Sequence, residues 1–275
     1  MSEQRTTSQG SAAAQAELWS EGAQDWAEVM EGWAGWGVPV YREVLEHLEV
    51  RPETDVLDVG CGAGRFARIA ADRGAAVAGL DATAAFVAIA RERVPHGDFR
   101  IGDMEELPWE DDSFDVVTGF NSFFIAADMV GALREAARVA RPGARIAMTV
   151  FGRPEHCRST ELFASLAQLS PAPGTGGGQR TQPGPGLHER GVLEDRAAGA
   201  GLTPLHAGYI AFTEEHADLD TMLRGYLAAP PFVRAARAYG REAVSEALAA
   251  AAAPMRTAGG RYEIADEVRY LIAEA

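Results

Sequence analysis

The sequence predicts an α/β fold in which a mostly parallel sheet carries helices on both faces. Three observations predict it. A short apolar stretch ends at Val59 and leads through a glycine-rich turn into a helical segment. Apolar strands and helical segments then alternate through residue 150, which is typical of strand–helix–strand units with parallel strands. Finally, 47% of the 275 residues are hydrophobic, which is enough to bury a full core.

Seven strands are expected, each from a short apolar run bounded by turn-forming residues. They cover residues 56–59, 76–80, 98–101, 114–119, 145–150, 202–212 and 262–272. The helices between them follow apolar residues at helical spacing, and Arg141-Pro142-Gly143 indicates a helix end. These helices cover residues 65–73, 82–93, 129–140, 162–169 and 189–200.

The chain divides into a core with helical additions at two places. The expected divisions are a disordered tail (residues 1–15), a helical lid (16–50), the core (51–212, with a mobile Gly/Pro loop at 170–187), a helical insertion or cap (213–258) and the last core strand (259–275). No internal repeat is present in the sequence.

Composition excludes several classes of protein. With a net charge of −15, nucleic acid and anionic membranes are unfavourable partners. All 25 basic residues are arginine, so no lysine is available for a Schiff base or as a general base. The two cysteines give neither a metal spacing nor a disulfide framework, and we expect no metal site. The polar N-terminus and the lack of long apolar runs predict a cytoplasmic protein, as a monomer or homodimer.

The turn Asp58-Val-Gly60-Cys-Gly62-Ala-Gly64 is the clearest functional motif. Open α/β sheets bind ligands at the carboxyl ends of their strands. Glycines let the backbone approach a ligand closely, and the helix that follows offers free N–H groups to a negative or polar group. The glycine spacing differs from the G-x-G-x-x-G of dinucleotide-binding proteins. A turn with a purely structural role is the alternative.

Together with later segments, this turn resembles the motifs of class I S-adenosylmethionine-dependent methyltransferases. The matching segments are Val56–Phe66, Gly79–Asp81, Gly102–Pro108, Ser113–Val117 and Leu133–Gly143. The resemblance is strong over residues 50–152 and weak elsewhere. It implies a Rossmann-like, doubly wound sheet of seven strands, mostly parallel with the last strand antiparallel, plus helical lid elements. It also implies S-adenosylmethionine as cofactor and S-adenosylhomocysteine as product.

The resemblance further implies which residues bind the cofactor. Asp58 would hold the ammonium side of its methionine part, Asp81 both ribose hydroxyls and Asp103 the adenine amino group. Asp81 could instead cap the helix that starts at Ala82, and Asp103 could form a turn. The full implied set is Asp58, Gly60, Cys61, Gly62, Gly64, Asp81, Ala82, Asp103, Met104 and Asn121.

The segment after the fourth strand has two possible roles. In the family this region lies under the transferable methyl group, so Asn121 could hydrogen-bond the cofactor or the acceptor. Phe123 and Phe124 could form a wall of the site. Alternatively, both phenylalanines belong to the core and Asn121 only ends a strand. Cys61 is expected to be a small buried filler rather than a nucleophile.

Four of the five tryptophans precede the first strand, where relatives place a lid over the cofactor. They are Trp19, Trp26, Trp33 and Trp36. Aromatic rings over a sulfonium would give cation–π attraction. The same spacing also fits one helix face packed on a core.

No residue is identified as catalytic from the sequence, and His156, His188 and Asn121 are only candidates. The two histidines flank the Gly/Pro loop after the fifth strand. Methyl transfer is an in-line SN2 displacement at an activated carbon, so placing the acceptor is the main requirement. A base is needed only if the acceptor must lose a proton, and we expect a mechanism governed by proximity.

The predicted function is transfer of a methyl group to a small organic, natural-product-like acceptor, or to a peptide terminus. The helical insertion favours an enclosed site for a discrete substrate over a flat surface for a macromolecule. The alternative is a methyltransferase-fold cyclase or isomerase, or a sensor, that binds the cofactor without transferring its methyl group. Formation of S-adenosylhomocysteine separates these two interpretations.

Overall fold

The structure is a computed structural model that describes residues 12–32, 35, 37–169 and 186–275. Its centre is a seven-stranded sheet in the order β3-β2-β1-β4-β5-β7-β6. The strands are β1 (Asp55–Val59), β2 (Ala76–Asp81), β3 (Asp98–Ile101), β4 (Phe114–Phe120), β5 (Ala140–Phe151), β6 (Thr203–His216) and β7 (Tyr262–Glu274). The first five strands are parallel, and β7 runs antiparallel to both β5 and β6. The predicted fold class is therefore confirmed.

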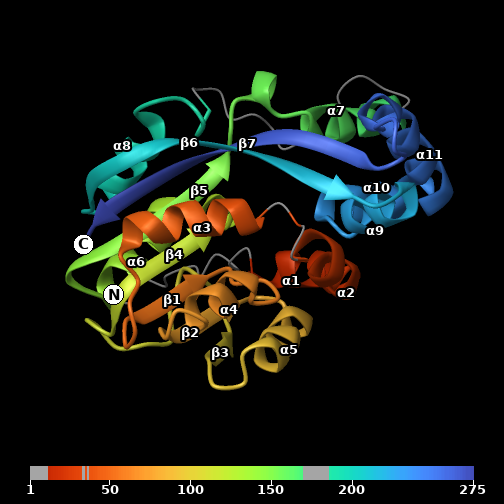
Figure 1. Cartoon of the computed structure of the whole chain (residues 1–275). Coiled ribbons are helices and arrows are strands. Elements are labelled where there is room, and N and C mark those ends of the chain that lie inside the picture. Colours follow the sequence, from red (N-terminus) through yellow and green to blue (C-terminus); the bar gives the residue numbers. More distant parts are fainter. Residues whose placement is uncertain (1–11, 33–34, 36, 170–185) are drawn as a thin grey trace, which may run out of the picture.

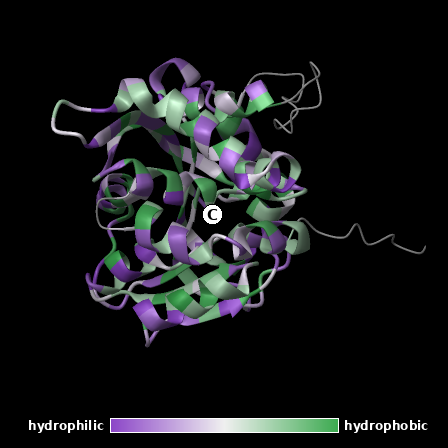
Figure 2. Ribbon diagram, turned by 90° about the vertical axis from the view of Figure 1, so that its right-hand side faces the viewer, coloured by the Kyte–Doolittle hydropathy of each residue, from purple (hydrophilic) through white to green (hydrophobic). Residues whose placement is uncertain are grey.

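Helices cover both faces of the sheet (Figure 1). Those of eight or more residues are α1 (Ala12–Ser20), α3 (Gly37–Leu48), α5 (Ala84–Arg93), α6 (Met129–Val139), α8 (Val192–Gly199), α9 (Leu219–Leu227), α10 (Pro230–Tyr239) and α11 (Arg241–Ala252). The shorter ones are α2 (Ala23–Asp25), the π-helical turn η1 (Trp26–Met30), α4 (Arg65–Ala71), η2 (Phe123–Ile125), η3 (Pro154–His156), α7 (Ser159–Ala164), η4 (Ser165–Leu169) and η5 (Ala253–Met255). In Figure 2 the helices show hydrophobic and hydrophilic residues side by side, as amphipathic elements over a buried sheet should.

Two apolar clusters define the faces of the sheet. On one face, α3 and α4 belong to one cluster with alternate residues of β7, among them Val268, Tyr270 and Ile272. On the other face, α6 and α8 pack against β5 and against Leu271 and Ala273 of β7. We call these the α3 face and the α8 face. Because strand side chains alternate, each residue of β7 can be assigned to one of the two faces.

β6 and β7 form a long antiparallel ribbon that continues beyond the carboxyl end of β5. β5 pairs with β7 only as far as Phe151 opposite Val268, whereas β6 and β7 stay paired out to His216 opposite Tyr262. Helices α9, α10 and α11 follow at the far end of this ribbon, and we call them the cap (Figure 1). The sixth strand was expected to end at Phe212, and it is longer because cross-strand pairing with β7 extends it through residue 216.

The N-terminal segment, α1 through η1, lies between the cap and α5. Trp19 and Trp26 contact both an apolar cluster with Phe86 of α5 and the cap cluster that contains Tyr226. The expected disordered tail is wrong for residues 12–15, which form the start of α1. Residues 1–11 and 170–185, where the rest of the tail and most of the predicted Gly/Pro loop fall, lie outside the described residues.

Smaller differences occur at element ends. β5 begins at Ala140 rather than Arg145, because Ala140 pairs with Phe114 before an irregularity in the ladder. The expected helix from residue 189 begins at Val192. Among the described residues, no helix has both the length and the apolar character needed to cross a membrane.

Candidate functional site

The glycine turn connects β1 to α4 at the carboxyl edge of the sheet. Gly60, Gly62 and Gly64 all have positive φ, at 74°, 52° and 80°, which side chains other than glycine rarely adopt. A Cβ atom at Gly60 would overlap Ser122, and one at Gly62 would overlap a carboxylate oxygen of Glu31. Glycine is therefore required at these two positions because Ser122 and Glu31 lie against the backbone of the turn.

The backbone N–H groups of this turn are already hydrogen-bonded. Ala63 donates to Oε1 of Glu31 at 2.9 Å, and Arg65 to Oε2 of the same residue at 3.4 Å. Gly62 donates to Oδ2 of Asp81 at 3.0 Å, and Gly64 to the carbonyl of Cys61 at 2.9 Å. The expectation of a free N–H group at the start of the helix is therefore wrong for Arg65. The N–H groups of Gly62, Ala63 and Gly64 also donate already to protein carboxylates or, for Gly64, to a carbonyl oxygen.

Asp58 is buried at the end of β1, with 3% of its surface exposed. Its Oδ1 accepts a hydrogen bond from the Thr118 hydroxyl on β4 at 2.8 Å, and no described arginine pairs with it. Burial raises the pKa of Asp58 from 3.8 to about 7, and the negative charges of Glu31 and Asp81 act in the same direction. This carboxyl group therefore favours the approach of a positive charge.

Stability should fall as the pH rises from about 4 to about 7. The folded protein keeps a proton on Asp58 in this range, whereas the unfolded chain has lost it, so rising pH favours unfolding. Burial raises the pKa of Asp266 to about 7 as well, and each group adds a slope of about 1.4 kcal/mol per pH unit. Urea unfolding at several pH values should show a smaller slope for Asp58→Asn than for the wild type. Equal slopes in the two proteins would contradict this prediction.

Asp81 is the last residue of β2, and Asp103 lies two residues after the end of β3. Oδ1 of Asp81 accepts from the backbone N–H of Thr83 at 2.8 Å, and Oδ1 of Asp103 accepts from that of Glu105 at 3.0 Å. The turn-forming role of Asp103 is thus present, whereas Asp81 does not cap the helix, because α5 begins at Ala84 with Thr83 as its N-cap. Each carboxylate offers about four lone-pair positions, so each keeps acceptor capacity for a ligand.

The other implied cofactor residues lie near these acids. Cys61 is buried, and burial raises the pKa of its thiol well above the usual value, as expected of a filler rather than a nucleophile. Ala82 directly follows Asp81 at the end of β2 and is half-buried. Met104 packs against the apolar core of the α8 face.

Asn121 directly follows β4 and has a positive φ of 50°, which is uncommon for residues other than glycine, although asparagine adopts it more often than most. Its Oδ1 accepts from the Thr149 hydroxyl at 3.1 Å, and its backbone N–H donates to that same hydroxyl oxygen at 2.9 Å. These contacts to β5 hold the strained conformation at the carboxyl edge of the sheet. Such strain occurs preferentially at functional sites.

The two phenylalanines after β4 have different environments. Phe123 is 1% exposed and belongs to the core of the α8 face, so the expectation that it forms a wall of an open site is wrong. Phe124 is partly buried, and its ring centroid lies 5.6 Å from that of Phe151. Phe151 ends β5 and is 54% exposed. Phe124 and Phe151 together therefore form an apolar surface at the ends of β4 and β5.

Two of the four lid tryptophans can be placed. Trp19 and Trp26 contact each other edge to face, with ring centroids 4.7 Å apart, and Trp19 also contacts Phe86. Their cluster includes Ala63 of the glycine turn, so the N-terminal segment lies directly on that turn. Trp33 and Trp36 lie outside the described residues.

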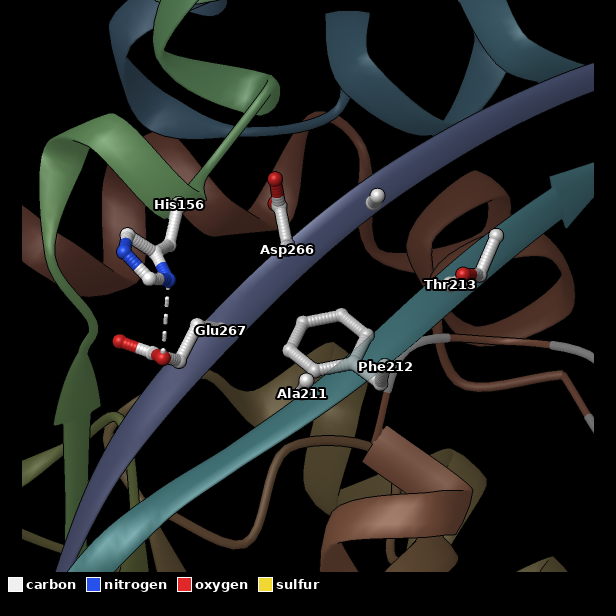
Figure 3. Close-up of a pocket in the computed structure, with 7 residues that line it drawn as sticks. His156, Ala211, Phe212, Thr213, Asp266 and Glu267 are labelled. Atoms are coloured by element: carbon white, nitrogen blue, oxygen red, sulfur yellow. Dashed lines mark ion pairs between the residues drawn. The ribbon is translucent and has the colours of Figure 1, made fainter.

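The candidate base His156 lies on the α8 face of the ribbon. Its Nδ1 is 3.5 Å from Oε2 of Glu267, and Glu267 alternates with Leu271 and Ala273 of that face. Both residues line a pocket of about 260 Å³ together with exposed Ala211 and Thr213. In Figure 3 the His156 ring and the Glu267 carboxylate point toward each other, whereas Asp266 projects away from them.

His188 is also close to the α8 face. Its carbonyl oxygen accepts from the hydroxyl of Tyr209 at 2.7 Å, and Tyr209 is paired with Arg269 on β7. The Arg153 guanidinium lies over the Tyr209 ring, 4.3 Å from its centroid, and pairs with Glu267. The two histidines thus share a neighbourhood that lies across the ribbon from α3.

Sequence reasoning missed a buried polar cluster on the α3 face of the ribbon. Oε2 of Glu214 accepts from the hydroxyl of Tyr226 at 3.0 Å and lies 3.3 Å from Nε2 of His216. Asp266, two residues beyond Val268 on the same face, accepts from the backbone N–H of Ser159 at 2.9 Å. Only strand register brings these residues together, and no local motif indicates it. Glu31 was missed because its contact with the glycine turn depends on how the N-terminal segment packs on the sheet edge.

The described residues contain no group of three or more His, Cys, Asp or Glu side chains placed to hold a metal ion. The acceptor-rich set at the carboxyl edge instead suits an organic ligand rich in donors. Carboxylates lie within the last two residues of β1, at the end of β2 and just after β3, and the asparagine follows β4. These strands are neighbours in the sheet, and the order reverses between β1 and β4, where open α/β sheets bind their ligands.

Comparison with known proteins agrees with this geometry. Residues 57–148 match the family model described as a methyltransferase domain. Methyltransferase GfsG of Streptomyces halstedii is 36% identical over 119 residues, covering 41% of this chain and 43% of that protein. Nocamycin O-methyltransferase of Saccharothrix syringae is 37% identical over 119 residues, covering 40% of this chain and 42% of the relative. The matches thus span less than half the length of these relatives.

A solved structure shows the same fold over nearly the whole chain. Phosphoethanolamine N-methyltransferase 2 of Haemonchus contortus, in complex with phosphomonomethylethanolamine and S-adenosylhomocysteine, superposes with a TM-score of 0.56. The superposition covers 93% of this chain and 57% of that one, at 17% identity.

Residues 57–148 therefore belong to a methyltransferase domain, and the relatives and the fold support the class I S-adenosylmethionine-dependent type. S-adenosylmethionine is the cofactor of this domain.

Proposed function

We propose that this protein transfers the methyl group of S-adenosylmethionine to a small organic acceptor enclosed between the N-terminal segment and the cap. The observation that carries the proposal is one apolar cluster that joins both elements above the sheet edge. Met30 of the N-terminal segment packs there with Tyr226 of the cap and Ile264 of β7. An enclosed chamber suits a discrete molecule and excludes water from the reaction.

The residues at the carboxyl edge fit this cofactor. Its ammonium group, ribose hydroxyls and adenine amino group are all donors, and the acids at the strand ends are acceptors. Asp58 would hold the ammonium group, Asp81 the ribose and Asp103 the adenine, with the backbone of residues 60–64 against the methionine part. When bound, the cofactor supplies a methyl group on a positively charged sulfur.

The chain's own residues then have to place the acceptor. Phe124 and Phe151 offer an apolar wall at the ends of β4 and β5, and Asn121 offers an amide group beside them. Holding the attacking atom about 3–3.5 Å from the methyl carbon, in line with sulfur, accounts for most of the required acceleration. We propose that proximity and exclusion of water, rather than a base, govern the rate.

The acceptor class follows from enclosure and from the relatives. One of the two relatives above is, by its name, an O-methyltransferase for nocamycin. We propose a natural-product-like acceptor of similar kind for this chain. The test is a turnover screen of candidate metabolites that follows S-adenosylhomocysteine release. Tight cofactor binding without any methylated product would favour the cyclase or sensor alternative.

Replacing His156 or His188 with glutamine should leave kcat/KM within about threefold of the wild type once a substrate is known. Both side chains are associated with the α8 face, across the ribbon from the proposed chamber. The pH–rate profile of each variant is the measurement. A loss of more than about a hundredfold, together with loss of a titration near neutral pH, would contradict this prediction.

Asp266→Asn is the matched comparison on the opposite face of β7. Asp266 is 8% exposed and is on the α3 face, and burial raises its pKa to about 7. If the reaction is governed by proximity alone, this variant also keeps its activity. A hundredfold loss confined to Asp266→Asn would identify Asp266 as a general base and overturn the proximity mechanism.

A further inference from the structure

Glu31 connects the N-terminal segment to the glycine turn through several hydrogen bonds. It directly follows η1 and is 6% exposed. Its carboxylate accepts from the backbone of Ala63 and Arg65, as described above, and pairs with Nη1 of Arg93 at 2.9 Å. Nε of Arg65 donates to the carbonyl oxygen of Glu31 at 2.6 Å. This carboxylate is therefore fixed against the second glycine of the turn.

The charges around the turn do not balance among the described residues. Three carboxylates, Glu31, Asp58 and Asp81, lie close enough to interact electrostatically, and burial raises the pKa of each. Arg93 forms an ion pair with Glu31, and the Arg65 side chain supplies a second positive charge nearby. With all three carboxyl groups ionised, the negative charge exceeds the positive charge by one, and buried charge is costly without a partner. A cation at this place would be stabilised.

We propose that Glu31 is a cofactor-binding residue contributed by the N-terminal segment, and that it accepts a hydrogen bond from the ammonium group of the cofactor's amino-acid end. The Glu31 carboxylate accepts three hydrogen bonds, from Ala63, Arg65 and Arg93, so about one of its four lone-pair positions remains. It lies beside Gly62, in the turn that receives the amino-acid end. Asp58 provides the second acceptor for the same group.

This assignment makes the N-terminal segment part of the cofactor site. Glu31 directly follows the single π-helical turn of the described chain, and its N–H donates to the carbonyls of Trp26 and Val29. π-Helical turns are rare and frequent at functional sites. Nη2 of Arg93 also donates to the carbonyl of Ala27, so the turn is held to α5 at two points.

The experiment is a calorimetric cycle on the full-length chain. S-adenosylhomocysteine and its desamino analogue, in which hydrogen replaces the ammonium group, are titrated into the wild type and into Glu31→Gln. If the hydrogen bond is charge-assisted, Glu31→Gln should weaken the binding of S-adenosylhomocysteine by about tenfold or more. The desamino analogue should bind both proteins equally. Glu28→Gln is the control, because Glu28 is in η1 but pairs with exposed Arg224.

Every outcome bears on the proposal. If Glu31→Gln loses affinity equally for both ligands, Glu31 only shapes the turn. If Glu31→Gln binds S-adenosylhomocysteine more tightly, Glu31 competes with the ligand's own carboxylate. Either result would overturn the proposal. If Glu31→Gln unfolds, the same cycle with Glu31→Asp keeps the charge but shortens its reach, and the selective loss should persist. Failure of the wild type to bind S-adenosylhomocysteine would instead contradict the cofactor assignment itself.

Discussion

Replacing Gly62 with valine should abolish binding of S-adenosylmethionine and its demethylated product. Gly62 has a φ of 52°, and a Cβ atom there would overlap the carboxylate of Glu31. The valine side chain would push Glu31 away from Ala63 and separate its buried ion pair with Arg93. Breaking one side of such a pair costs about 3–5 kcal/mol. We expect more than a hundredfold loss of affinity by calorimetry, with a lower melting temperature.

Gly143→Val is the matched control for this prediction. Gly143 also has a positive φ, 81°, but a Cβ atom there would contact nothing within 4 Å. Valine at this position therefore strains the backbone without overlapping any neighbouring atom. We expect reduced stability but unchanged cofactor affinity in this variant. Equal loss of affinity in both variants would show that strain, rather than the contact with Glu31, explains the result.

The core of the fold could be predicted because its signals are local. The apolar run of β1, the three glycines and the helix after them are contiguous in sequence, and the acids lie at or next to the ends of the first three strands. Strand ends in a parallel sheet meet at one edge, so contiguous signals were enough to bring Asp58, Asp81 and Asp103 together.

The faces of the ribbon could not be predicted, because they depend on register. His156 follows β5 by a few residues, and sequence position alone suggested that it reaches the substrate. Its partner Glu267 and the neighbouring Asp266 point to opposite faces of β7, and a shift of one residue exchanges them. The burial of Phe123 beside the partly exposed Phe124 is likewise set by tertiary packing.

Glu31 shows a second limit of prediction from the sequence. It lies more than 30 residues from the turn that it contacts, in a segment whose apolar spacing drew attention to the tryptophans. Nothing local separates Glu31 from the exposed Glu28 three residues earlier, although one is 6% exposed and the other pairs with Arg224 at the surface. The contact is visible only once the N-terminal segment is placed on the sheet edge.

Deleting residues 1–36 should abolish methyl transfer while leaving a folded core. The clusters that cover the two faces of the sheet include α3, α4, α6 and α8 but no residue of α1, α2 or η1. The deletion removes Met30 from the cap cluster and Trp19 and Trp26 from their contacts with α5. Water would then reach the sheet edge, and the acceptor would lose one side of its chamber. Circular dichroism checks the fold, and S-adenosylhomocysteine release measures activity.

Deletion of residues 1–11 alone is the control, because α1 begins at Ala12. This shorter deletion should keep full activity. The longer one should also weaken S-adenosylhomocysteine binding, because it removes Glu31 and leaves Arg93 without its partner. It further breaks the ion pairs of Arg224 with Asp25 and Glu28, so the cap should become more accessible to protease. Full activity after the longer deletion would instead place Trp19 and Trp26 in a purely structural role, because turnover would then proceed without any enclosure from the N-terminal side.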